Sequence, residues 1–231
     1  MSKLFRFVQL TIALALILSM GTMAANAQEL REVPRERTVI FDIDGKEVRN
    51  PDIFNPFVHG AFKNDGHHQS MWEPLFILNY ETGEIMPWLG ESMECNETLD
   101  VWTLKLRPGI KWADGEDFNA DDVVFTTELQ MEHSGELSNY SAEIANWVES
   151  VEKIDDLTVQ YNLKVPNPRF QLDHYSVRMW GSVIIVPEHV FADQDPLTFK
   201  FNDPEKGWPF ATRPYLTVYW SETEFTWDRN D

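Results

Sequence analysis

The sequence predicts a mixed α/β fold, because short strand patterns and helical patterns follow one another along the chain. Two stretches alternate between apolar and polar residues, at 102–107 and at 157–164, which is typical of half-buried strands. Between them, Val124, Phe125 and Leu129 supply an apolar stripe for a helix. Helix and strand therefore alternate within one segment.

The remaining predicted elements are shorter. We expect strands at residues 38–43, 75–80, 183–186, 215–219 and 224–228, and a short helix at 187–191. Residues 144–154 are ambiguous, because the apolar residues up to Val151 recur with helical spacing while 148–154 could equally be the first strand of a hairpin. We therefore expect a helix that ends near Asn146 and a strand that begins near Val148.

The first 27 residues are typical of an export signal rather than of a folded domain. Lys3 and Arg6 precede an apolar run at residues 7–20, and Ala25-Asn26-Ala27 supplies the small-residue site that a signal peptidase requires. The run is shorter than the ~20 apolar residues of a membrane-spanning helix. We expect a signal peptide at residues 1–27 and a periplasmic mature chain; the alternative is an uncleaved membrane anchor.

The overall composition excludes some classes of partner and favours others. Lys and Arg number 19 against 38 Asp and Glu, so the formal net charge is −19 at pH 7. Such a chain repels the phosphates of nucleic acids, and we expect no nucleic-acid partner. Nine Trp and 15 Phe favour a binding role, because large planar side chains stack against uncharged organic ligands. The single cysteine, Cys95, has no second cysteine with which to form an internal disulfide.

One acidic stretch allows three interpretations: a metal loop, a catalytic acid cluster or the start of a helix. Its carboxylates are Asp114, Glu116, Asp117, Asp121 and Asp122. A calcium loop counted from Asp114 fails, since Phe118 takes a ligand position and Asn119 the position of the required glycine. A catalytic pair stays open, although the sequence shows no pocket for it. Helix initiation explains more of the pattern, because Asn119 is a good N-cap and the first turn favours negative charge.

Three motifs then occur in a recognisable order. The chain reads WEPLFILNYETGEIMPWLGESM at residues 72–93, WTLKLRPGIKWADGEDFNADDVVF at 102–125 and VESVEKIDDLTVQYNLKVPNP at 148–168. In this order the chain resembles the bacterial extracellular solute-binding proteins that serve peptide, nickel and oligosaccharide ABC transporters. The matching letters are Glu73-Pro74-Leu75, Thr82-Gly83, Pro87, Leu89, Glu91-Ser92, Leu106-Arg107, Gly109, Asp114-Gly115, Ala120, Asp122 and Val123.

The resemblance implies a two-lobed, periplasmic-binding-protein-like α/β fold that is truncated here to its first part. Residues 28–75 and 168–231 would form an incomplete first lobe and 76–167 its small subdomain, with the second lobe absent. Because half a cleft encloses little of a ligand, weak binding is expected of such a piece. Two residues depart from the family pattern: Ala211 and Arg213 stand where the family has glycine.

The resemblance also implies a function: a monomeric, extracytoplasmic component of an ABC import system that captures an oligosaccharide for a membrane permease. The segments HQSMWEPLF and DPEKGWP look most like the oligosaccharide-binding branch. A di- or oligopeptide is the alternative ligand. The expected ligand-binding residues are Asn64, His67, His68, Gln69, Trp180, Phe210, Thr212 and Arg213.

Other classes of function remain as alternatives. A secreted acidic glycoside hydrolase would use two carboxylates, and an adhesion domain would bind no small ligand. The resemblance implies no enzyme, no catalytic residue and no cofactor. His67 and His68 could chelate a metal, but no other His or Cys lies within a helical turn, so we expect a polar loop rather than a metal site.

Overall fold

The computed structural model describes residues 33–40, 48–61, 70–138, 140–177, 181–212 and 215–229. All of these residues belong to one compact unit, Val33–Asp231. The predicted signal peptide and residues 41–43 lie outside the described residues, while 38–40 form no strand. None of the helices in the described ranges has both the length and the apolar composition that crossing a bilayer requires.

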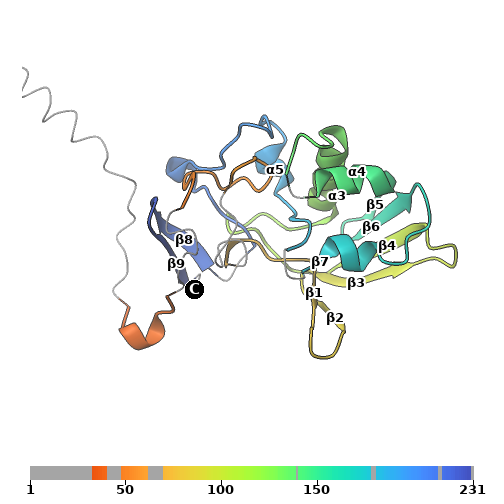
Figure 1. The fold of residues 1–231 in the computed structure, drawn as a ribbon, viewed down its shortest axis with the longest axis horizontal. Helices are drawn as coiled ribbons and strands as arrows, with labels where there is room; N and C mark the ends of the chain where they lie inside the picture. Colours follow the sequence, from red (N-terminus) through yellow and green to blue (C-terminus); the bar gives the residue numbers. More distant parts are fainter. Residues whose placement is uncertain are drawn as a thin grey trace, which may run out of the picture. The chain divides into compact units, whose positions relative to one another are not determined.

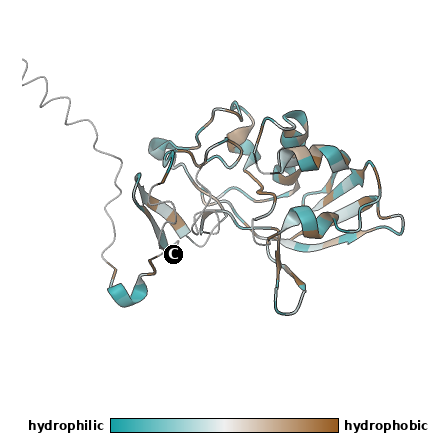
Figure 2. Ribbon diagram, in the orientation of Figure 1, coloured by the Kyte–Doolittle hydropathy of each residue, from teal (hydrophilic) through white to brown (hydrophobic). Residues whose placement is uncertain are grey.

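A four-stranded antiparallel sheet lies at the centre of the segment in which helix and strand patterns alternate. Its strand order is β3 (Gly90–Cys95), β4 (Val101–Leu106), β6 (Thr158–Leu163) and β5 (Val148–Asp155). The strands predicted from the alternation at 102–107 and 157–164 are thus confirmed as two neighbours. Every second residue, from Trp102 to Leu106 and from Val159 to Leu163, faces the core and is between 0 and 8% exposed. The ribbon coloured by hydropathy shows brown parts among white and teal ones along these strands (Figure 2).

Two helices pack beside this sheet (Figure 1). Helix α3 (Ala120–Glu132) contacts α4 (Ser141–Trp147) and the strands β5 and β6. Val123 is fully buried on the inner face of α3. Helix α4 ends where β5 begins, at Val148, so the predicted change from helix to strand is confirmed to within one residue.

A smaller mixed sheet carries the hairpin that later forms one wall of the candidate site. It contains β2 (Ile85–Pro87), β1 (Phe76–Leu78) and β7 (Ser176–Val177), with β1 antiparallel to β2 and parallel to β7. The turn between β1 and β2 contains Gly83 with φ at +76°, a conformation that glycine adopts without strain. A one-turn π-helix, η2 (Gln171–Tyr175), leads into β7.

The last part of the described chain forms a two-stranded hairpin. Its strands β8 (Tyr215–Trp220) and β9 (Phe225–Arg229) confirm the two strands predicted there. Trp220 and Phe225 pack edge-on against Phe54, with ring centroids 5.1 Å and 6.1 Å away. The short helices elsewhere are η1 (Arg35–Arg37), α5 (Glu188–Phe191) and η3 (Pro204–Lys206), and α5 confirms the helix predicted at 187–191.

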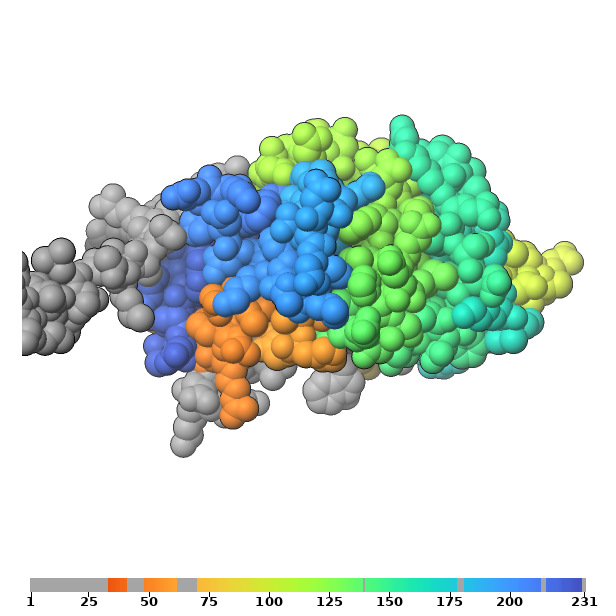
Figure 3. All heavy atoms as spheres, turned by 90° about the horizontal axis from the view of Figure 1, so that it is seen from above, coloured from red at the N-terminus to blue at the C-terminus, as the bar shows by residue number. Residues whose placement is uncertain are grey.

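Segments far apart in sequence meet around an aromatic core. The backbone amides of Phe54 and Asn55 donate to the carbonyl of Lys200, and the side-chain amide of Asn55 donates to the carbonyl of Phe199. The space-filling view shows these two segments, orange and blue, side by side (Figure 3). The rings gathered here are Phe191, Phe199, Phe201, Trp208 and Phe210.

One predicted strand is wrong. Residues 183–186 are apolar and buried but form no strand. Their backbone instead finds partners outside any sheet: the amide of Val183 donates to the carbonyl of His174 at 2.7 Å, and that of Val186 donates to Thr126 Oγ1 on α3 at 3.1 Å. A continuous apolar run indicated burial correctly, but burial alone does not specify a ladder of strand hydrogen bonds.

Candidate functional site

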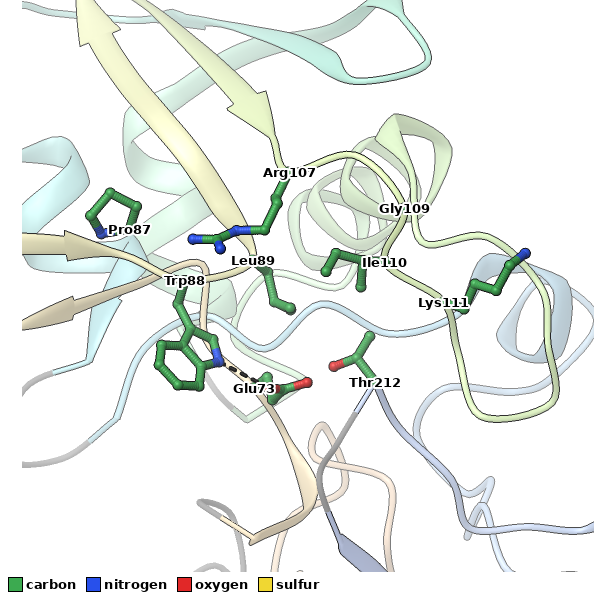
Figure 4. A pocket seen from close by; sticks show the side chains of 9 residues that line it. All are labelled: Glu73, Pro87, Trp88, Leu89, Arg107, Gly109, Ile110, Lys111 and Thr212. Atoms are coloured by element: carbon green, nitrogen blue, oxygen red, sulfur yellow. Dashed lines mark hydrogen bonds between the residues drawn. The ribbon is translucent and has the colours of Figure 1, made fainter. Parts of the chain in front are cut away.

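A depression of about 470 Å³ lies where the β1–β2 hairpin, the segment after β4 and the segment before β8 come together (Figure 4). This volume falls within the range of about 300 to 1,000 Å³ of small-molecule sites. The lining residues are Glu73, Pro87, Trp88, Leu89, Arg107, Gly109, Ile110, Lys111 and Thr212. Aromatic, apolar, anionic and cationic groups therefore border one space.

The β1–β2 hairpin positions an exposed indole on one side of the depression. Because Phe76 pairs with Pro87, the residues just outside the hairpin, Glu73 and Trp88, are brought together. Trp88 Nε1 donates to Glu73 Oε1 at 2.9 Å, and the backbone amide of Trp88 donates to the carbonyl of Leu75 at 3.0 Å. The residue is 45% exposed although ring and backbone are both held. An indole fixed in this way can receive a flat ligand with little loss of side-chain entropy.

Close packing beneath the hairpin fixes the segment that carries this indole. The backbone of Gly90 lies against the ring of Phe76, and a Cβ atom at Gly90 would come within 2.5 Å of Phe76 Cζ. The neighbouring Leu89 is 4% exposed, and its amide donates to the carbonyl of Pro74. Glycine is therefore required here for space rather than for an unusual backbone angle.

Two cations border the depression, but only one of them has a partner among the described residues. Lys111 Nζ is paired with Asp117 and donates to the carbonyl of Gly115 at 3.1 Å, and its end points away from Trp88 (Figure 4). Arg107 is exposed, and within the described part of the chain no side chain or carbonyl accepts from its guanidinium. Its backbone amide is fixed by the carbonyl of Leu89 at 2.9 Å.

The acidic stretch has a structural role around one buried carboxylate. Asp122 is 4% exposed and accepts from Trp112 Nε1 at 2.9 Å and from the backbone amides of Asn119 at 3.1 Å and Glu188 at 2.9 Å. Burial raises the pKa of Asp122 above its ordinary value, and these hydrogen bonds oppose part of that rise. The carboxylate thus ties together the loop before α3, the start of α3 and the start of α5.

The other acidic residues lie in the turn before α3 and in the first turn of α3, as predicted. Asn119 Oδ1 accepts from the amide of Asp121 at 2.7 Å, which confirms the predicted N-cap. Asp121 forms an ion pair with Lys153 at 2.8 Å, and Asp114 lies 2.7 Å from His189 Nε2. No group of three or more potential metal ligands occurs within the described ranges.

Of the two predicted ligand-binding residues that the structure describes, one lines the depression. Thr212 does so, whereas Phe210 is 5% exposed and packs against Trp112 and Phe201 in the aromatic core. The other predicted residues lie outside the described residues: Asn64, His67, His68, Gln69, Trp180 and Arg213. Ala211 is fully buried and is not among the described residues with positive φ, so its backbone here does not require glycine.

The sequence interpretation missed the residues that form the polar and aromatic wall, namely Glu73, Trp88 and Arg107. The register in which Phe76 pairs with Pro87 places Trp88 opposite Leu75, two residues from Glu73, so a hairpin with its turn at Gly83 was the local signal that could have brought the two side chains together. No comparable local signal exists for Arg107, because its approach to the hairpin depends on the pairing of β3 with β4.

Residues 84–231 match the family described as bacterial extracellular solute-binding proteins, family 5 (middle part). The chain is 30% identical over 179 residues to the dipeptide-binding protein of Escherichia coli, which covers 70% of this chain and 31% of that protein. It is 29% identical over 140 residues to the periplasmic alpha-galactoside-binding protein of Rhizobium meliloti, covering 59% of this chain and 20% of that protein.

The fold is similar to that of solved binding proteins of the same kind. A crystal structure of a mannohexaose-bound, periplasmic oligopeptide-binding protein of an ABC transporter from Thermotoga maritima matches with a TM-score of 0.61 and 26% identity, covering 79% of this chain and 32% of that one. The chain thus spans less than a third of the length of the curated relatives just described. The motifs, the mixed α/β fold and the family match agree: the chain belongs to the bacterial extracellular solute-binding proteins of family 5.

Proposed function

We propose that the chain contributes to solute capture in the periplasm, as part of the binding component of an ABC importer, and that the solute is an oligosaccharide. Membership of the solute-binding family supports the first part. The alpha-galactoside-binding relative and the mannohexaose-bound structure support the second. Delivery would be to a membrane permease, and no step of chemistry on the solute is required of this chain.

The observation that carries the oligosaccharide proposal is the held indole of Trp88. A sugar ring presents a flat face of C–H groups that packs on an indole, while its hydroxyl groups need planar polar side chains at the edge. Glu73 supplies an acceptor beside the indole, and Thr212 supplies a hydroxyl across the depression (Figure 4). Leu89 and Ile110 provide the apolar part of the lining.

A peptide is the second candidate. The dipeptide-binding relative from Escherichia coli favours it. The guanidinium of Arg107, for which the described residues offer no acceptor, would suit the terminal carboxylate of a peptide. A glycoside hydrolase has no such support, because the matched relatives are named as binding proteins and the buried Asp122 is occupied by three donors of the chain itself.

A ligand panel on the 231-residue chain tests the proposal. We expect alpha-galactoside oligosaccharides or mannohexaose to bind with a dissociation constant on the order of 1 mM, because an open depression encloses the ligand on one side only. Protein-observed NMR titration measures such affinities, and product analysis checks that the sugar is not cleaved. Binding of dipeptides without any sugar would overturn the oligosaccharide proposal, and release of product would overturn the binding function.

Two matched variants show whether the depression is the site. Trp88→Ala removes the indole, and Tyr80→Ala removes an aromatic ring that is 69% exposed in the turn of the same hairpin. We expect Trp88→Ala to weaken sugar binding by about tenfold, as for other ring stacking that is lost on truncation to alanine, and Tyr80→Ala to leave it unchanged. Equal effects of the two variants would contradict the placement of the site.

The division into lobes is likewise a proposal. Residues 76–167 would form the small subdomain and 28–75 with 168–231 the first lobe. In this division the depression lies at the boundary, since Glu73 and Thr212 come from the lobe and Trp88 and Arg107 from the subdomain. A ligand bound there would contact both parts.

A further inference from the structure

We propose that the depression selects an acidic sugar: a hexuronate unit whose ring stacks on Trp88 and whose carboxylate pairs with Arg107. This inference rests on the proposed oligosaccharide function and names the class of sugar. It revises the expectation of an uncharged ligand that the many aromatic residues suggested.

The surroundings make an unpaired guanidinium informative. The chain has a formal net charge of −19, with twice as many acidic as basic residues, so acceptors for a cation are plentiful. The other cation of the depression, Lys111, is paired with Asp117 and with the carbonyl of Gly115. Lys153, Arg169 and Lys200 are paired with carboxylates elsewhere. The backbone of Arg107 is fixed by a hydrogen bond to Leu89, but no described residue accepts a hydrogen bond from its guanidinium, which can therefore donate to a ligand.

The two ends of the depression differ in charge and so give a ligand a direction. Glu73 lies on the side where Trp88 Nε1 points, and Arg107 lies on the opposite side of Leu89 (Figure 4). A ligand carboxylate would be repelled by Glu73 and attracted by Arg107. Hydroxyl groups, which can donate, would face Glu73 and Thr212. The hydroxyl groups of a neutral sugar can donate to Glu73, but they offer the guanidinium of Arg107 only uncharged acceptors, which bind it more weakly than a carboxylate.

A hexuronate has the shape that this arrangement requires. Its pyranose ring keeps a C–H face for the indole, and its carboxylate projects from the ring edge in place of a hydroxymethyl group. The planar guanidinium can meet a carboxylate with two parallel hydrogen bonds, which a single neutral hydroxyl cannot accept. The same fork discriminates against an ester, because an ester has no charge and its alkoxy oxygen is a poor acceptor.

The first test compares ligands that differ in one group. Digalacturonate, its methyl diester and the neutral digalactoside of the same linkage are titrated into the 231-residue chain by protein-observed NMR. We expect digalacturonate to bind about fivefold to tenfold more tightly than the diester and the neutral sugar, since the pair with Arg107 is partly solvated and charge-assisted. The advantage should shrink at 1 M salt, where screening acts over about 3 Å.

The second test compares two cations on neighbouring positions. Arg107→Gln removes the proposed partner, and Lys105→Gln removes an exposed positive charge two residues earlier, on β4, outside the depression. We expect Arg107→Gln to abolish the preference for digalacturonate over its diester. Arg107→Lys should restore part of the preference, and Lys105→Gln should leave it intact.

The outcomes separate this inference from the function on which it rests. Equal affinity of the acid, the ester and the neutral sugar would overturn the uronate proposal and leave the oligosaccharide function standing. Loss of all sugar binding in the unaltered chain would overturn both. Binding of a dipeptide carboxylate that depends on Arg107, without binding of digalacturonate, would assign Arg107 to a peptide ligand and overturn the uronate proposal.

Discussion

Two adjacent regions between the end of β4 and the first turn of α3 differ in how their charged side chains are used. In residues 107–111, Arg107 is exposed and lines the depression without an acceptor among the described residues. In residues 112–122, the carboxylates of Asp114, Asp117, Asp121 and Asp122 all have partners within the chain. The region with more charge is therefore the one with less capacity to bind something else.

This difference distinguishes polar side chains that stabilise the fold from polar side chains that can bind a ligand. A carboxylate that already accepts two or three hydrogen bonds has little left to offer a ligand, and removing it leaves its donors unsatisfied. An exposed guanidinium beside a held indole can bind a ligand without first breaking a contact of the protein. We therefore expect substitutions in the acidic region to change stability and substitutions in the cationic region to change affinity.

The largest effect should come from Asp122→Ala. Truncation leaves three buried donors, Trp112 Nε1 and the amides of Asn119 and Glu188, without an acceptor. We expect a loss of about 3 to 5 kcal/mol in the free energy of unfolding, measured by urea denaturation. Asp121→Ala is the matched control, since Asp121 is a half-buried residue of the same helix turn whose side chain is 46% exposed, and it should cost less than about 1 kcal/mol. Similar losses for both would contradict the special role of Asp122.

Gly90→Ala should have the next largest effect, through packing rather than charge. The added methyl group would lie 2.5 Å from Phe76 Cζ, and Phe76 is only 1% exposed. We expect a destabilisation of about 1 to 3 kcal/mol, since an overpacked core must shift side chains or backbone. Thermal unfolding measures it, and the double variant Gly90→Ala with Phe76→Leu should recover part of the loss. If the loss in the free energy of unfolding of the double variant equals the sum of the losses in the two single variants, the clash with Phe76 is not the cause.

Asp114→Asn should have a smaller effect, again on stability. Asp114 Oδ2 lies 2.7 Å from His189 Nε2, and its Oδ1 accepts from the amide of Glu116 at 3.2 Å. Asparagine can keep the contact within the turn but weakens the link to α5. We expect a loss of about 0.5 to 1.5 kcal/mol, with ligand affinity unchanged, from paired denaturation and titration measurements. A large fall in affinity at unchanged stability would place Asp114 in the binding site instead.

Local patterns in the sequence predicted the fold best where each element has its own signal. The alternation at β4 and β6, the cap at Asn119 and the change from α4 to β5 all depend on neighbouring residues, and the structure has each of them. Residues 183–186 failed because an apolar run reports burial, whereas a strand also needs a partner strand. No property of those four residues specifies Thr126 as the hydrogen-bond partner of Val186.

The candidate site was harder to predict because it is built from long-range contacts. Thr212 was predicted and lines the depression, but Phe210, two residues away, is taken up by the core. Aromatic residues carry no mark in the sequence that separates a packed ring from an exposed one: Trp112 is 2% exposed and Trp88 is 45% exposed. The difference arises from the hairpin that places Trp88 beside Glu73, and that arrangement requires strand pairing to be known.

The variant with the smallest expected effect on stability, Asp117→Asn, tests the comparison most directly. It removes the carboxylate that pairs with Lys111, so this cation becomes more like Arg107. The side chain of Lys111 is 58% exposed. We expect a change in stability below about 0.5 kcal/mol, since exposed ion pairs contribute little. Lys111 borders the depression, and without Asp117 its ammonium keeps only the carbonyl of Gly115 as a partner, so the affinity for digalacturonate should rise by about twofold while that for the neutral digalactoside stays constant. Glu116→Gln removes a neighbouring charge that is not paired with Lys111, and an equal rise in that variant would show a general field effect rather than the release of one cation.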